Sequence, residues 1–294
     1  RGASSPTTPA CPRATPARAR GPSLRRARRA REAGSQDVGS RRFEAFGVLR
    51  CRRRLLAFFL ALPLLCAVAQ AHAASSADAL LARHAAMQAQ LATSPMGRPL
   101  TVDSEELPGG LRGEVFAEVD QPFAQVVQAL SRPANWCDML LLHVNNRRCR
   151  LLKTDGGGRA VELSVVRRYD LPVESAFILQ MALRIDDGAP DYLSVDLGSE
   201  NGPMGTSQHR VQLEAIALAG GSRTFMHFSY SYQHNTLARL ASQAYLGTFG
   251  RNKVGFTEVG QGTNGPEYIR GLRGLVERNA VRYFLTVDAY LDAM

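Results

Sequence analysis

The sequence lacks the short motifs that carry the commonest enzyme chemistries. It has no GxSxG nucleophile elbow, no Walker A sequence, no HExxH and no GxGxxG after a predicted strand. These absences argue against hydrolysis of acyl or phosphoryl bonds by a familiar catalytic arrangement. No CxxC or Cys/His spacing indicates a metal site, so we expect neither a cofactor nor a metal, and we assign no catalytic residue.

Long apolar runs are also scarce, and the single one lies from Leu55 to Ala69. Arg50 and Arg52–Arg54 precede it, and Ala71 and Ala73 follow it with the small side chains that a signal peptidase requires. We predict a signal peptide over residues 48–73, cleaved near Ala73, and a periplasmic mature protein beginning at Ala74. A membrane anchor is the alternative, but the run is shorter than the roughly 20 residues that span a bilayer.

Positive charge is confined to the beginning of the chain. Residues 1–54 hold 15 arginines and three acidic residues, whereas the rest of the chain is slightly acidic. A basic arm for nucleic acid is one reading of Arg25–Arg31. We instead expect residues 1–47 to be disordered or untranslated upstream sequence, and we expect no nucleic-acid partner, because nothing before a cleaved signal stays with the exported protein.

Cysteine is rare after the predicted cleavage site, where only Cys137 and Cys149 remain. In an oxidising compartment a lone pair is usually one disulfide, which we predict here. Two free buried thiols are the alternative.

The mature region is predicted to consist mostly of β-strands in which apolar and polar residues alternate. We expect a helix over 76–92, a linker over 95–110, strands within 111–119, 144–152, 161–169, 177–185, 192–197, 210–218 and 224–234, short helices within 120–130, 133–141 and 237–246, and a long helix over 266–293. Short connections favour an antiparallel sheet with one buried face.

This order of elements resembles the START-like, polyketide-cyclase-like helix-grip superfamily, most closely in Glu114–Leu140. The resemblance implies an α+β fold, with a curved seven-stranded antiparallel sheet around a long C-terminal helix. We predict an N-terminal helix and linker over 74–110 and the helix-grip domain over 111–294, with an additional helix and Gly-rich loop at 236–265.

The resemblance also implies a cavity for an apolar or amphipathic ligand such as a lipid, sterol or polyketide. We therefore expect a periplasmic binding or carrier protein, with transient membrane contact as a further possibility. The alternatives are a cyclase or aromatase-type enzyme using cavity residues such as Arg167, Tyr230 or His143, and a solid-cored protein whose surface binds a partner.

Candidate ligand-binding residues follow from the alternation of the strands. We expect inward-facing side chains at Arg167, Tyr169, Leu179, Met181, Met226, Phe228, Tyr230 and Tyr232, and on the final helix at Leu272. Arg167 suits a ligand's carboxylate or phosphate, or else an ion pair with Glu174 or Asp170.

Six glycines lie between Gly247 and Gly265. We predict a lid over Thr248–Gly265 that turns Phe249, Val254 and Phe256 toward the ligand; a surface excursion unrelated to binding is the alternative.

Overall fold

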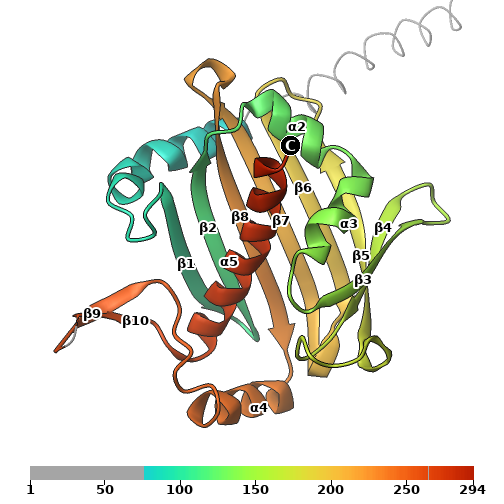
Figure 1. Cartoon of the computed structure of the whole chain (residues 1–294), viewed down its shortest axis with the longest axis vertical. Coiled ribbons are helices and arrows are strands. Elements are labelled where there is room, and N and C mark those ends of the chain that lie inside the picture. The colour runs from blue at the N-terminus through green and yellow to red at the C-terminus, as the bar shows by residue number, and fades with distance from the viewer. Residues whose placement is uncertain (1–75, 264) are drawn as a thin grey trace, which may run out of the picture. The chain divides into compact units, whose positions relative to one another are not determined.

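The computed structural model describes residues 76–263 and 265–294, and the predicted signal peptide and upstream segment lie outside this range. The described residues build a single large antiparallel sheet in the order β1-β2-β8-β7-β6-β5-β4-β3, with helices on both of its faces (Figure 1). The strands are β1 (Leu100–Leu107), β2 (Gly110–Val119), β3 (Asn146–Lys153), β4 (Arg159–Val165), β5 (Phe177–Asp186), β6 (Tyr192–Asn201), β7 (Thr206–Leu218) and β8 (Arg223–His234).

The long helix α5 (Gly271–Asp292) lies across one face of this sheet and packs against β1, β2 and β8 (Figure 1). It buries Val276, Ala280, Phe284 and Val287 against the apolar face of the strands. Two shorter helices, α2 (Phe123–Leu130) and α3 (Pro133–Leu141), cover the same face beside it. Burial of this apolar surface is the main stabilising contribution, at about 25 cal/mol per Å².

The opposite face of the sheet is covered by a helix over residues 76–92. Its Leu80, Met87 and Leu91 pack with Phe116 and Phe225 in a second, smaller apolar cluster. This placement accounts for its helical spacing of apolar residues, because only one of its faces meets the protein. No helix among the residues described is long and apolar enough to cross a bilayer.

The predicted fold class is confirmed, with two corrections to its boundaries. The sheet has eight strands and not seven, since part of the predicted linker forms β1 at the edge. The final helix begins at Gly271, because Pro266 belongs to β10 (Gly265–Tyr268), which pairs with β9 (Glu258–Gly262) in a separate two-stranded sheet. Figure 1 shows this small sheet projecting beside β1.

Helix α4 (Thr236–Gly247) follows β8 and lies near the N-terminal end of α5 (Figure 1). The Asn235 side chain caps it by accepting a hydrogen bond from the N–H of Ala238 at 2.8 Å. Only Leu246 of this helix is buried. The helix therefore contributes little to the core.

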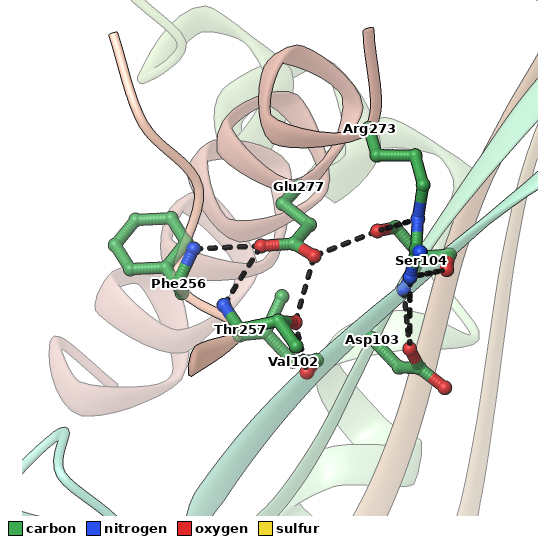
Figure 2. Close-up of polar contacts among 7 residues, drawn as sticks. All are labelled: Val102, Asp103, Ser104, Phe256, Thr257, Arg273 and Glu277. Atoms are coloured by element: carbon green, nitrogen blue, oxygen red, sulfur yellow. Dashed lines mark hydrogen bonds and ion pairs between the residues drawn. The ribbon is translucent and has the colours of Figure 1, made fainter. Parts of the chain in front are cut away.

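A buried carboxylate ties the segment after α4 to α5 and β1 (Figure 2). Glu277 is fully buried on α5. Its two oxygens accept hydrogen bonds from the N–H of Phe256 at 2.6 Å, from the N–H and hydroxyl of Thr257 at 3.0 and 2.7 Å, and from the hydroxyl of Ser104 at 2.7 Å. Arg273 also donates to Ser104. The charge is thus compensated by donors from two separate segments, residues 256–257 and β1.

The predicted disulfide is confirmed. Cys137 of α3 and Cys149 of β3 are bonded, and their Cα atoms lie 5.3 Å apart, within the range that a disulfide spans. The bond joins α3 to the outermost strand on its side of the sheet. It therefore fixes α3 against this edge strand.

Candidate ligand site inside the helix grip

A small cavity of about 50 Å³ lies between the sheet and the covering helices. Most of its walls are aliphatic side chains from the central strands. The remainder are the ring of Pro203 and three side chains that carry polar atoms, namely His209, Tyr230 and Tyr283. The aliphatic lining residues are Leu140, Leu163, Val165, Leu179, Met181, Leu197 and Val211.

His209 and Tyr230 form the polar part of this cavity. They project from neighbouring strands β7 and β8, and the Nδ1 atom of His209 lies 3.2 Å from the Tyr230 hydroxyl. The other ring nitrogen of His209 lies 2.8 Å from the Thr206 hydroxyl. Tyr232 stacks on His209 with ring centres 5.5 Å apart, and Tyr283 approaches Tyr230 at the same distance.

His143 adds an unused hydrogen-bonding atom beside these rings. Its ring stacks on that of Tyr283, with centres 4.3 Å apart. Its Nδ1 atom accepts the backbone N–H of Asn145 at 3.2 Å, so the neutral ring carries its proton on Nε2. That Nε2 atom is buried, and it has no hydrogen-bond partner among the residues described. A ligand oxygen would satisfy it.

Burial keeps these groups uncharged. It lowers the pKa of His209 to about 4, and burial together with the positive charge of Arg282 lowers the pKa of His143 to about 4. Burial also raises the pKa of Tyr232 and of Tyr283 to about 12, and that of Tyr230 well above its usual value. At neutral pH the cluster therefore offers donors and acceptors without charge, which suits an amphipathic molecule more than an ion.

Comparisons with known proteins concern the fold alone. No protein-family model matches the sequence, and no curated protein matches it. Solved structures do match. The lipid transfer and protein localization domain of human StarD13 is 7% identical, with 64% of this chain and 84% of that chain covered and a TM-score of 0.39. Human StAR-related lipid transfer protein 5 is 10% identical, with 76% and 98% covered and a TM-score of 0.39.

Norcoclaurine synthase from Thalictrum flavum, solved with dopamine and hydroxybenzaldehyde, is 14% identical, with 51% of this chain and 80% of that chain covered and a TM-score of 0.33. The predicted fold class rests on the antiparallel sheet and α5 described above, and these likenesses, with TM-scores below 0.5, add nothing to it. At these identities the likeness says nothing about ligand or reaction.

The predicted ligand-binding residues divide into those at the cavity and those elsewhere in the core. Leu179, Met181 and Tyr230 line the cavity. Tyr232 is half-buried beside it, next to His209. Met226, Phe228 and Leu272 belong to the main apolar cluster but are not among the lining residues. Whether any of these residues binds a ligand stays a prediction.

The inward orientation predicted for Arg167 and Tyr169 is wrong. Strand β4 ends at Val165, and Val166 is buried, whereas the four residues that follow are exposed. The alternation that placed Arg167 inward therefore stops two residues before it. Asp170, suggested as its partner, instead pairs with Arg168.

The orientation predicted for the lid residues is also wrong in part. Phe249 is 91% exposed, so it does not face the interior. Phe256 is half-buried against the main core and Val254 is half-buried. None of the described residues of 248–265 lines the cavity. The segment is also less irregular than predicted, because β9 lies within it and pairs with β10, which begins at its last residue.

Three residues of the site did not appear among the predicted ligand contacts. His209 shares its face of β7 with Val211, Leu213 and Ala215, so the period of two was sufficient to place it inward. Tyr283 gave no comparable signal, and His143 was named only as a cavity residue of the alternative enzyme. The positions of both depend on how α5 and the loop before β3 pack against the sheet.

Proposed function

We propose that this protein binds a small apolar or amphipathic molecule between the sheet and α5. The observation that carries the proposal is the cavity itself, which combines aliphatic walls with the uncharged polar groups of His209, Tyr230 and Tyr283. Behind Tyr283, the buried Nε2 atom of His143 has no hydrogen-bond partner among the residues described. Such a lining is typical of sites that enclose an apolar body and orient it through a few polar contacts.

The cavity must enlarge to hold such a ligand. Its volume of about 50 Å³ is well below the roughly 300–1,000 Å³ of ordinary ligand sites. We place the movable wall at the connection between β6 and β7 and the first residues of β7, where Pro203 and His209 touch the cavity. Met204 and Gln208 have φ angles of 55° and 49°, which side chains disfavour. Local strain of this kind marks segments that change conformation.

The proposal is tested by filling the cavity. Val211→Phe places a larger side chain in the space, so ligand binding should fall at least tenfold while the protein stays folded. Ile216→Phe is the matched control, because it crowds the apolar cluster under helix 76–92 and not the cavity. The ligand is first sought by mass spectrometry of material extracted from the purified protein. Equal binding by Val211→Phe and the wild type would contradict the interior site.

We further propose that the protein acts as a carrier in the periplasm. The disulfide between Cys137 and Cys149 supports an oxidising compartment, because such bonds are uncommon in a reducing cytoplasm. N-terminal sequencing of the protein from a periplasmic fraction tests this. A start near Ala74 is expected, and residues upstream of Leu55 in that fraction would contradict it.

One observation favours an enzyme as a second candidate. The 3.2 Å contact between His209 and Tyr230 is a titratable pair inside a cavity, which acid–base catalysis requires. The pKa of about 4 for His209 makes it a weak base, so binding remains the better supported function. If the pair is catalytic, Tyr230→Phe abolishes turnover of the extracted ligand while leaving its binding intact.

A further inference from the structure

A second and larger cleft, of about 410 Å³, lies where α4 meets the start of α5. Its charged and polar lining comes from β1, α4, the segment after α4 and the first turn of α5. These residues are Glu106, Gln243, Arg251, Lys253, Arg270 and Arg273. Four positive charges therefore surround one cleft against a single carboxylate. None of these residues lines the cavity within the helix grip.

The positive charges have few acidic partners. Within the part of the chain that the structure describes, no carboxylate forms an ion pair with Arg251, Lys253 or Arg270. Arg273 has only Asp103, whose carboxylate is 3.8 Å away and mostly exposed. Cations that converge without counter-charges repel one another, and a bound anion relieves that repulsion.

The fold holds these cations around the cleft. The Arg270 guanidinium donates to the backbone carbonyl of Arg251 at 3.1 Å. The Lys253 ammonium donates to the Tyr245 hydroxyl at 2.5 Å and lies 5.0 Å from the centre of that ring. The backbone N–H of Lys253 donates to the carbonyl of Gly250 at 2.8 Å, which closes the turn. These contacts fix the backbone that carries the charged side chains. The Arg251 guanidinium, which has no ion pair among the described residues, can bind an anion.

The start of α5 adds backbone donors to the same cleft. Gly271, Leu272 and Arg273 line it, and no side chain of a described residue caps this end of the helix. Gly271 has a φ angle of 68°, a conformation that glycine adopts without strain. The first N–H groups of a helix favour negative charge, so they act in the same direction as the four cations.

We infer that this cleft is a binding site for a small anionic group, a phosphate or a carboxylate. Arginine provides paired donors that match the oxygens of either group, and lysine provides a point charge. The site is separate from the interior cavity and does not depend on the function proposed for it.

Titration with inorganic phosphate, followed by amide NMR, tests the inference. The amide signals of Gly271, Leu272 and Arg273 should shift with saturation, and Arg251→Gln combined with Lys253→Gln should weaken binding about tenfold or more. Arg239→Gln is the matched control, because Arg239 is exposed on α4 but does not line the cleft. Equal weakening by Arg239→Gln would overturn the site, since it would reflect only the general charge of this region.

A second titration, with a monomeric short-chain phosphatidic acid, identifies the source of the anion. Tighter binding than that of inorganic phosphate, lost in the same double variant, assigns the cleft to a lipid headgroup. Equal affinity for the two probes assigns it to a free anion. Failure of both probes to shift the three amides overturns the inference, whatever is found in the interior cavity.

Discussion

Glu277 receives both the backbone N–H and the side-chain hydroxyl of Thr257, at 3.0 and 2.7 Å (Figure 2). This contact attaches the segment between α4 and β9 to the middle of the protein. Gly255 makes the approach possible, because a Cβ atom there would lie 2.3 Å from a Glu277 oxygen. The segment is therefore attached to α5 at this point, although several residues on either side of it are exposed.

Glu277→Gln should lower the free energy of unfolding by about 2 kcal/mol. The amide keeps the volume of the carboxylate but turns a donor toward groups that also donate. Urea denaturation measures the change. Glu267→Gln, on the exposed side of β10, is the control and should have almost no effect. Equal stability of the two variants would show that the buried charge is not needed.

Acid should destabilise the protein through its two buried histidines. The pKa of His143 and of His209 is lowered to about 4, whereas unfolded histidine titrates near 6.5, so the unfolded state binds more protons between these values. Stability is therefore lost as pH falls from about 6.5 toward 4, by about 3 kcal/mol for each histidine.

His209→Gln removes one of these contributions. Its unfolding free energy should fall less steeply than that of the wild type over the same pH range, as measured by denaturation at several pH values. Parallel curves for the two proteins would mean that His209 titrates normally in the folded state.

His227 should have the opposite pH dependence. Burial opposes its charge, but hydrogen bonds to Glu114 at 2.9 Å and to Glu214 at 3.0 Å outweigh burial and raise its pKa. Its stabilising contribution is present below about pH 6.5 and is lost as pH rises through the raised pKa. The difference in stability between the wild type and His227→Gln should therefore shrink from pH 6 to pH 9. A difference that stays constant would contradict a charged imidazole.

Gly202→Ala should disturb the polar end of the cavity. A Cβ atom at Gly202 would lie 2.1 Å from Nε2 of His209, so the imidazole must move and its contact with Thr206 is lost. We expect about 1–3 kcal/mol of destabilisation and weaker ligand binding. Gly156→Ala is the control, because nothing lies within 4 Å of its added carbon. A crystal structure of Gly202→Ala with His209 unmoved would refute the close packing.

Much of the sheet could be predicted because its central strands alternate strictly. Strand β5 was placed to within one residue, since its inward positions are all large and apolar. Strand β1 was missed because Asp103, Glu105 and Glu106 mask its pattern. Only one neighbour pairs with it, so its outer edge tolerates charge.

The candidate site was less predictable for a related reason. Tyr230 and Leu179 follow from alternation, but the end of β4 before Arg167 depends on a change of direction that local sequence does not reveal. The burial of Glu277 was equally hidden. Its partners Ser104 and Thr257 lie far from it in the chain, and a charged residue in a helix is ordinarily exposed.

The position of α5 in the chain also constrains the order in which the protein can fold. Strand β2 gains its second neighbouring strand only when β8 pairs with it, as Gly113 does with Tyr230. The apolar face of both strands then stays uncovered until α5, which follows every strand of the sheet in the chain, reaches it. Contacts this distant in the chain form slowly. Under the proposed route of export, the chain would therefore cross the membrane before its core could close, and folding would begin on the far side.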